Sequence, residues 1–333
     1  MSVTPITVAV IGGGSWATAL VKILTENRVV THWWLRNPDD VEHLNQVCHN
    51  PRYLSNVQFN LHYARPTTNL EEALAHATYV VLAVPAAFVT GALAGLQAAH
   101  FKGKYIVSAV KGMIPVQNTL ITDYFEHKYD VPKQNICVIG GPCHAEEVAL
   151  EKQSYLTIGA HDLETASGFA ALLQNRYIKA TPLADVDGIE YCAVMKNIIA
   201  LSCGIAHGLN YGDNFQAVMV SNAMLEIERF LDVVMPRHRS LIGSAYLGDL
   251  LVTAYSQFSR NRTFGNMIGR GYSVKSAQME MNMVAEGYYA TKSIYEVSRK
   301  LNLELPITTA AYNILYERIS PAMEMRILKE KFV

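Results

Sequence analysis

Short apolar runs alternate with helix-compatible segments through the first half of the chain. Strongly apolar runs, which predict buried strands, cover residues 6–11, 29–35, 79–85, 105–110 and 136–139, and weaker runs cover 155–160 and 177–181. Helical patterns lie between several of these runs, over about residues 16–27, 39–48, 70–77 and 88–98. Such alternation is typical of an α/β fold with a mostly parallel sheet, in which ligands bind at the carboxyl ends of the strands.

The pattern changes around Asp185, where strand-like runs stop and long helical segments begin. These segments cover about residues 186–207, 214–235, 246–256, 259–269, 273–279, 286–301 and 308–316. A chain of 333 residues suggests two domains at about 150 residues each. We therefore predict an α/β domain over residues 1–185 and an all-α domain over residues 186–333. Its last segment, 320–333, carries no motif that we can use.

A glycine-rich turn joins the first predicted strand to the first predicted helix. Gly12, Gly14 and Ala17 follow the spacing G-x-G-x-x-G/A of a dinucleotide site. Gly12 lets the chain turn sharply, Gly14 lets the backbone approach a pyrophosphate, and Ala17 lets the helix pack closely on the strand. The N–H groups at the helix start then attract phosphate. We predict a Rossmann-type domain, although a glycine turn in an ordinary strand–helix unit gives the same local pattern.

The end of the second predicted strand indicates which dinucleotide binds. An Asp or Glu about 20 residues after the glycines binds the ribose 2′-hydroxyl of NAD. Arg36 and Asn37 occupy that position here, so no acidic side chain there repels a 2′-phosphate, and Arg36 can pair with one. This pattern favours NADP(H) and leaves NAD(H) usable. The alternative is that Arg36 is an ordinary solvated surface arginine.

Lys196 lies among apolar residues in the helical half of the chain. The run 191–201 is apolar on both sides of it, which predicts a largely buried helix. A buried charge is costly unless it has a use, and a buried amine can serve as a general base near neutral pH. Asn197 is then suited to bind a substrate or to fix Lys196. The alternative is a lysine that extends from the helix edge to water.

A second charge and a basic turn follow later in the same half. Asp249 lies among apolar residues and suits an orienting partner for a buried lysine, and Thr253 shares its helix face. The alternative is that Asp249 caps a helix. The run Ser259-Arg-Asn-Arg262 gathers donors that suit phosphate. A solvated basic turn is the alternative there, and for Arg262 alone we favour it.

Composition and spacing exclude several classes of protein. Lys and Arg number 28 against 29 Asp and Glu, a net charge of -1, which argues against a nucleic-acid-binding protein. The 5 cysteines form no C-x-x-C pair, so neither a disulfide framework nor a zinc site is indicated, and a reduced compartment is the simplest expectation. His43, Cys48 and His49 lack ligand spacing, so we predict no metal. No Walker-type or G-x-S-x-G loop supports a kinase or hydrolase.

No targeting or membrane segment is recognised in the sequence. The first apolar run lacks a preceding basic region and breaks at three glycines, unlike a signal peptide. No apolar stretch approaches the roughly 20 residues that span a bilayer. We therefore expect a cytoplasmic protein that is not inserted in a membrane.

A series of motifs runs from the first strand to about Tyr316 in the order seen in one known family. They cover residues 12–19, 110–113, 140–148, 195–198, 208–213, 247–250, 259–262 with 264–265, 284–287 and 305–307. On these motifs the chain resembles the bacterial NAD(P)-dependent glycerol-3-phosphate dehydrogenase family. The resemblance implies reversible reduction of dihydroxyacetone phosphate to sn-glycerol 3-phosphate, which supplies phospholipid synthesis, and it allows a homodimer.

The resemblance also implies roles for individual residues. Lys196 would accept the proton of the substrate hydroxyl, Asp249 would bind substrate and hold Lys196, and Lys111 would contact both substrate and cofactor. The expected cofactor contacts, with the glycine turn, are Gly12, Gly14, Ser15, Trp16, Arg36, Lys111, Ala145, Arg260, Val284 and Glu286. The expected substrate contacts are Lys111, Gly141, Cys143, Lys196, Asn197, Asp249, Thr253, Ser259, Arg260 and Asn261.

Three departures from the family pattern concern substrate affinity more than reaction type. Ala17 stands where the family usually has Gly, Cys143 where it usually has Ser or Thr, and residues 191–195 are larger than usual. Two other functions stay open. A dehydrogenase of the same architecture that acts on another hydroxy acid would not need a substrate phosphate, and a non-catalytic NADPH-binding regulator would bind cofactor without turnover.

Overall fold

The computed structural model describes residues 5–281 and 285–333, and the chain divides into two compact units. The sheet unit contains the residues up to Val84, with Phe88–Val110 and Ile121–Val186. The helical unit contains Pro85–Ala87, Lys111–Leu120 and the residues from Asp187 onward. Two short segments of the first half of the sequence therefore belong to the helical unit. The single predicted boundary near residue 185 assigns both of them to the sheet unit instead.

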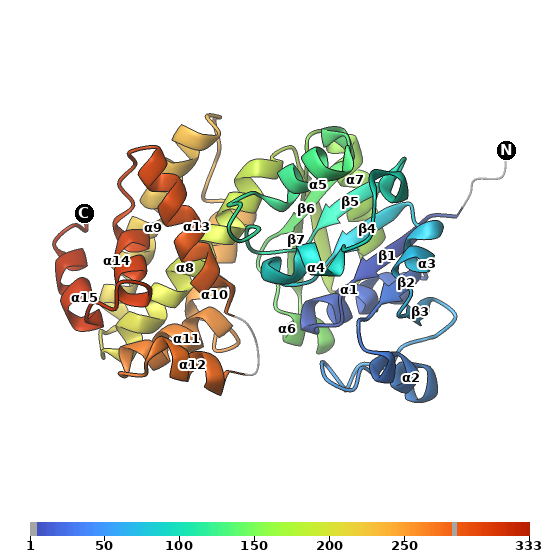
Figure 1. The fold of residues 1–333 in the computed structure, drawn as a ribbon, viewed down its shortest axis with the longest axis horizontal. Helices are drawn as coiled ribbons and strands as arrows, with labels where there is room; N and C mark the ends of the chain where they lie inside the picture. The colour runs from blue at the N-terminus through green and yellow to red at the C-terminus, as the bar shows by residue number, and fades with distance from the viewer. Residues whose placement is uncertain (1–4, 282–284) are drawn as a thin grey trace. The chain divides into compact units, whose positions relative to one another are not determined.

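The sheet unit is built on an eight-stranded sheet whose described strands have the order β3-β2-β1-β4-β5-β6-β7-β8 (Figure 1). The strands are β1 (Thr7–Ile11), β2 (Val30–Trp34), β3 (Ala64–Thr67), β4 (Tyr79–Leu82), β5 (Tyr105–Ser108), β6 (Ile136–Gly140), β7 (Ser154–Ala160) and β8 (Ile178–Leu183). Neighbouring strands are parallel, except that β6 and β7 are antiparallel. The order reverses at β1, and ligands of such sheets bind at that reversal.

Helices and short turns connect the strands of this unit. They are α1 (Ser15–Glu26), α2 (Pro38–Val47), α3 (Leu70–Ala75), α4 (Val89–Ala92), α5 (Ile121–Tyr129), α6 (Ala145–Ala149) and α7 (Leu163–Leu173), with 3-10 turns η1 (Ala86–Phe88), η2 (Ala98–Phe101) and η3 (Lys133–Asn135). The strand β1 is fully buried from Val8 to Ile11, and α1 buries most of its length against the sheet. This buried pair positions the glycine turn between them.

Several elements of the sheet unit differ from the predicted pattern, and α5, α6 and α7 were not predicted at all. The helix predicted over residues 88–98 is wrong in extent, because α4 covers only Val89–Ala92 and the chain reaches Gly95 with a φ of 90°. A positive φ is incompatible with a continuing helix. The strand β3 was not predicted, because Arg65 and Pro66 interrupt its apolar pattern. Proline is tolerated there because β3 is an edge strand.

The helical unit consists of helices from the second half of the chain (Figure 1). They are α8 (Val186–Gly208), α9 (Asp213–Val234), α10 (Asp249–Tyr255), α11 (Arg260–Gly269), α12 (Val274–Glu280), α13 (Glu286–Lys300), α14 (Pro306–Leu315) and α15 (Pro321–Lys329), with a π turn η4 (Ser244–Gly248). The helix predicted over residues 246–256 is in fact this π turn followed by α10. The change of helix type brings Asp249 to the start of a new helix.

The core helix α8 corrects one expectation. It is long and apolar enough, by length and composition alone, to span a membrane, which contradicts the expectation that the sequence contains no such stretch. Its charged residues Asp187, Glu190 and Lys196 are spaced widely enough to leave a long apolar window. Within the protein 94% of that window is buried, as in the core helix of a helical bundle.

A buried carboxylate on α9 fixes the start of α14. Both oxygens of Glu226, which is 2% exposed, accept hydrogen bonds. Oε2 accepts the N–H of Ile307 over 2.7 Å, and Oε1 accepts the N–H and the hydroxyl of Thr308 over 3.0 and 2.6 Å. The first turn of α14 therefore has its free amides satisfied by a side chain from another helix.

Candidate functional site

The turn after β1 has the geometry that a pyrophosphate site requires. Gly12 has a φ of 137°, and a Cβ there would overlap the carbonyl oxygen of Ala83. A Cβ on Gly14 would meet no described atom within 4 Å, so the space beside it is open. The helix α1 begins at Ser15 without a side-chain cap and with no acidic residue in its first turn. This helix start therefore suits an anion.

Two tryptophans lie at this turn. Trp33 of β2 is fully buried, and its Nε1 donates to the carbonyl oxygen of Gly12 over 2.7 Å. This bond ties the glycine turn to the neighbouring strand, a contact that the apolar pattern alone could not reveal. Trp16, in the first turn of α1, has a buried Nε1 with no hydrogen-bond partner among the described residues. A buried donor without a partner is costly, so Trp16 fits a contact with a bound dinucleotide.

The end of β2 carries the residue on which the NADP(H) prediction rests. Arg36 is exposed and lies two residues beyond β2. Asn37 caps α2 by accepting the N–H of Asp39 over 3.0 Å. Asp40, also in the first turn of α2, pairs with Nε of Arg52 over 2.9 Å. The exposed cation after β2 is thus Arg36, and the nearby carboxylate of Asp40 is balanced by Arg52. This arrangement is compatible with a contact between Arg36 and a 2′-phosphate.

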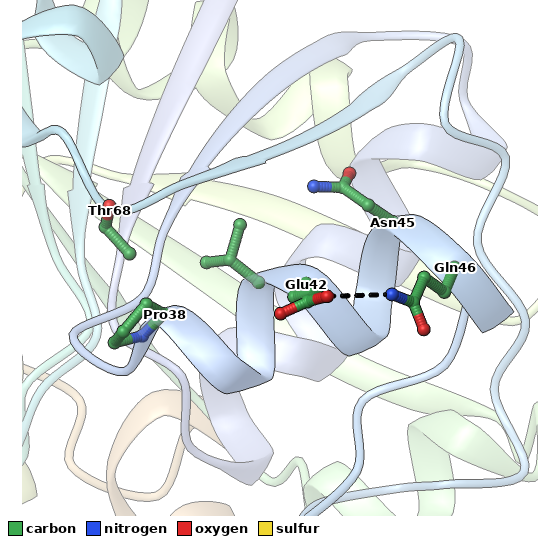
Figure 2. A pocket seen from close by; sticks show the side chains of 6 residues that line it. Pro38, Glu42, Asn45, Gln46 and Thr68 are labelled. Atoms are coloured by element: carbon green, nitrogen blue, oxygen red, sulfur yellow. Dashed lines mark hydrogen bonds between the residues drawn. The ribbon is translucent and has the colours of Figure 1, made fainter.

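A surface hollow lies beside α2 and the end of β3. It is lined by Pro38, Val41, Glu42, Asn45, Gln46 and Thr68 (Figure 2). The α2 residues recur at three- to four-residue spacing, so they share one helix face. On that face Oε1 of Glu42 accepts Nε2 of Gln46 over 2.9 Å. None of the predicted site residues lines this hollow.

A second strand-to-helix turn follows β6. Gly141 has a φ of 97°, and a Cβ there would lie 2.8 Å from the carbonyl oxygen of Tyr155 on β7. Cys143 is half-buried, and the buried Ala145 begins α6. Because β1 and β6 point the same way in the sheet, this turn and the glycine turn lie at the same edge. The predicted sheet-unit contacts therefore gather at the carboxyl ends of strands.

The helical unit buries a lysine against an aspartate. Nζ of Lys196 on α8 donates to Oδ1 of Asp249 on α10, and the two residues are only 8% and 2% exposed. The side chain of Lys196 therefore does not extend to solvent. The N-cap residue of α10 is Gly248, so Asp249 does not cap this helix. Oδ2 of Asp249 is buried with no partner among the described residues. Thr253 donates its hydroxyl to the carbonyl of Asp249 over 2.6 Å.

Asn197 holds a neighbouring segment of the same unit. Its Nδ2 donates to the carbonyl oxygen of Lys111 over 2.7 Å, and Asn197 is 4% exposed. The amide is thus used to fix the main chain at Lys111 and not the amine of Lys196. Lys111 begins the segment Lys111–Leu120, which the helical unit takes from the first half of the sequence.

The start of α11 is joined to the start of α13. Ser259 caps α11 by accepting the N–H of Arg262 over 3.3 Å. Oδ1 of Asn261 accepts the N–H of Gly287 over 2.8 Å, so its NH2 group is the end that remains for an anion. A Cβ on Gly287 would lie only 2.5 Å from the backbone carbonyl oxygen of Asn197 and 3.0 Å from Oδ1 of Asn261. Glycine is therefore needed at position 287. In the sequence, this need is indicated only by the position of Gly287 directly after Glu286.

A buried carboxyl group begins α13. Oε1 of Glu286 accepts the N–H of Ala86 over 2.9 Å, while Oε2 is buried with no partner among the described residues. Burial raises the pKa of Glu286, and the Ala86 N–H and the charge of Arg260 act against that rise. A Cβ on Gly112 would lie 2.7 Å from Oε2, so a glycine is needed there as well. Val284, also predicted to contact cofactor, lies outside the described residues.

The two sets of residues define a class of protein. The sheet unit has a glycine turn built for a pyrophosphate, and the helical unit has a buried lysine–aspartate pair. This combination is typical of a nicotinamide-dependent dehydrogenase with separate cofactor and substrate units. No group of three or more potential ligands among the described His, Cys, Asp and Glu residues is suited to hold a metal ion.

Comparison with known proteins identifies the family. Residues 7–166 match the family model for the N-terminus of NAD-dependent glycerol-3-phosphate dehydrogenase, and residues 185–326 match the model for its C-terminus. The chain therefore belongs to the NAD-dependent glycerol-3-phosphate dehydrogenase family and is an oxidoreductase. This confirms the family, enzyme class and fold class predicted from the sequence.

Individual relatives agree over nearly the whole chain. It is 36% identical over 325 residues to a glycerol-3-phosphate dehydrogenase of an Exiguobacterium species, which covers 97% of this chain and 95% of the relative. It is 35% identical over 317 residues to that of Limosilactobacillus reuteri, with 93% of each chain covered. The crystal structure of the Coxiella burnetii glycerol-3-phosphate dehydrogenase superposes with a TM-score of 0.90 at 26% identity, covering 98% of this chain and 99% of that one.

Proposed function

We propose that this chain reduces dihydroxyacetone phosphate reversibly to sn-glycerol 3-phosphate, with Lys196 as the group that exchanges the proton. Family membership and the names of the relatives support the reaction. The observation that supports the role of Lys196 is its buried bond to Asp249, whose second oxygen has no described partner. A bound reduced nicotinamide supplies the hydride.

Proton transfer falls to Lys196. In the reducing direction its ammonium group donates a proton to the carbonyl oxygen as the carbonyl carbon is reduced, which leaves an alcohol and a neutral amine. In the reverse direction the amine takes the proton of the hydroxyl group. Asp249 holds the amine in place, and its open Oδ2 can accept a hydrogen bond from the substrate hydroxyl.

The phosphate of the substrate is assigned to the start of α11. Arg260 offers a planar set of donors, and Asn261 keeps its NH2 group for an anion because Gly287 occupies its oxygen. Phosphate binding far from the carbonyl orients the reacting carbon. Lys111 would contact the substrate and cofactor from a segment that Asn197 fixes. Cys143 would offer a weaker thiol contact in place of a hydroxyl.

The sheet unit would hold the cofactor at the glycine turn. Trp16 has an open buried donor there, and Arg36 favours NADP(H) over NAD(H). Glu286 and Arg260 would contribute from the helical unit. The protein would act in the cytoplasm and supply phospholipid synthesis, and a homodimer remains a prediction of the family resemblance.

Loss of absorbance by reduced nicotinamide tests the proposal. Purified protein is mixed with dihydroxyacetone phosphate and either NADPH or NADH. Fast loss with NADPH and slow loss with NADH supports the enzyme and the role of Arg36. Equal loss with both supports the enzyme and removes the role of Arg36. Cofactor binding without loss in either well overturns the proposal and favours a regulator, whereas turnover of a hydroxy acid without phosphate favours the other dehydrogenase.

A further inference from the structure

The helices α8 and α11 touch through their backbones at four glycines. A Cβ added to Gly204 would overlap the carbonyl oxygen of Arg262, and one added to Gly208 would overlap that of Asn266. In the other direction, a Cβ on Gly265 would overlap the carbonyl oxygen of Leu201, and one on Gly269 that of Ile205. We call these four glycines the glycine seam.

The glycine seam fixes the register between α8 and α11. Leu201 meets Gly265, and four residues later on each helix Ile205 meets Gly269. Four residues earlier on each helix stand Asn197 and Asn261, and both contact Gly287. Successive turns of α8 therefore face successive turns of α11, with both helices running in the same direction, and one turn earlier the two helices meet at Gly287 of α13.

This register fixes where the chemistry lies. Lys196 stands five residues before Leu201, and Arg260 stands five residues before Gly265. The proton-transfer group and the phosphate anchor therefore sit at the same level of the two helices, about one and a half turns before the contact of Leu201 with Gly265. How closely the helices approach at the seam determines how far apart these two groups stand.

A buried oxygen atom without a described hydrogen-bond partner also lies at the Lys196 end of these helices. Asp249, bound to Lys196, is 2% exposed, and its Oδ2 has no partner among the described residues. A buried carboxylate oxygen is rarely left unpaired in a structural role. The proposed function assigns the reacting oxygen of the substrate to this open atom and Nζ of Lys196.

We propose that Gly204, Gly208, Gly265 and Gly269 are positioning residues that set the distance between Lys196 and the phosphate anchor. The proposal rests on the function proposed above. Glycine in a helix interior is destabilising relative to alanine, so four of them at one crossing need a reason. Close backbone approach is the property that only glycine provides here. A methyl group at the seam must push the helices apart by roughly 1 Å to restore ordinary contact.

The test separates positioning from general stability by comparing two substrates. Dihydroxyacetone phosphate uses both Lys196 and the anchor, whereas dihydroxyacetone carries the same carbonyl without the phosphate. We define the phosphate advantage as the ratio of kcat/KM for the first substrate to that for the second. Misplacing a bound group by about 1 Å can cost on the order of a hundredfold in rate. Gly204→Ala should therefore lower the phosphate advantage by at least about tenfold.

Gly212→Ala is the matched control. It adds the same methyl group in the same unit, four residues after Gly208, where a Cβ meets no described atom within 4 Å. Its phosphate advantage should stay within about twofold of the wild-type value. Arg260→Ala removes the anchor itself and should show the same loss as Gly204→Ala. If Gly204→Ala loses activity equally on both substrates, or on neither, the proposal is overturned.

A second seam variant covers the case in which Gly204→Ala does not fold. Gly269→Ala places the methyl group at the last residue of α11, where the helix end can shift more easily. The same drop in phosphate advantage is expected, and an unchanged ratio overturns the proposal. A wild-type enzyme with no phosphate advantage would instead refute the function proposed above, so the two failures are distinguishable.

Discussion

Replacing Lys196 by methionine separates its chemical role from its structural one. Methionine keeps a long, flexible apolar side chain but removes the amine that bonds to Asp249. Asp249 is 2% exposed and its other oxygen has no described partner, so the variant leaves a buried carboxylate without compensation. Breaking a buried ion pair in this way typically costs about 3 to 5 kcal/mol of unfolding free energy.

The double variant Lys196→Met/Asp249→Leu removes that cost. It replaces both charged groups by apolar side chains, and replacing a buried ion pair in this way is often neutral or stabilising by about 1 to 4 kcal/mol. We therefore expect the single variant to be the less stable and the double variant to recover most of the loss. Neither variant can transfer a proton at this position, so turnover should fall by about 10² to 10⁴ in both.

Three measurements decide the matter: thermal unfolding, binding of NADPH, and turnover of dihydroxyacetone phosphate at equal cofactor occupancy. Binding of NADPH should stay near normal in both variants. Lys292→Met is the control, because Nζ of Lys292 lies 3.9 Å from Glu296 with its side chain 55% exposed, and exposed pairs contribute under about 1 kcal/mol. Wild-type turnover in Lys196→Met would refute the proton-transfer role. A double variant as unstable as the single one would refute the account of the pair.

Three further predictions follow from single residues. Arg36→Gln should lower kcat/KM for NADPH by about tenfold and leave NADH within about twofold, and equal losses with both cofactors would remove its role. Burial raises the pKa of Glu286 above its ordinary value of 4.5, so the folded state binds this proton more tightly than the unfolded chain does. The stability of the wild type relative to Glu286→Gln should therefore be greatest below pH 4.5 and fall as the pH rises through the raised pKa, and a pH-independent difference in urea unfolding would contradict this. Glu226→Gln turns one acceptor toward Ile307 and Thr308 into a donor and should cost about 1 to 3 kcal/mol in thermal unfolding, whereas the exposed Glu228→Gln should not.

The sequence predicted the fold well where burial alone decides the structure. The central strands β1, β4, β5 and β6 are apolar along nearly their whole length, and together with β2, β7 and β8 they make seven strands that produced visible runs. The exception, β3, is a four-residue edge strand with Arg65 and Pro66 inside it. It forms by pairing with β2, and its own residues have no apolar pattern that would predict a strand. The predicted helix over residues 88–98 failed for the opposite reason, since Ala and Leu favour a helix that Gly95 prevents.

The candidate site was predictable where a side chain stands out from its surroundings. A lysine in an apolar helix and an aspartate in another apolar run drew attention to Lys196 and Asp249. The main-chain partners of Asn197 and Glu286 left no such signal, because a backbone carbonyl such as that of Lys111 and a backbone N–H such as that of Ala86 occur in every sequence. Which segments join the helical unit depends on tertiary packing, so the bonds to these groups could not be predicted.

Three enclosed carboxylates of the helical unit show how structure separates a supporting role from a ligand-binding one. In Glu226 each oxygen accepts a hydrogen bond from α14. In Asp249 and in Glu286 one oxygen is bonded and the other is buried with no partner among the described residues. All three pay the same kind of desolvation cost, so burial cannot explain the difference. The fold provides hydrogen-bond donors to both oxygens of Glu226, but to only one oxygen each of Asp249 and Glu286 among the described residues. We therefore infer that the open oxygens face the bound substrate and cofactor, whereas Glu226 serves the fold.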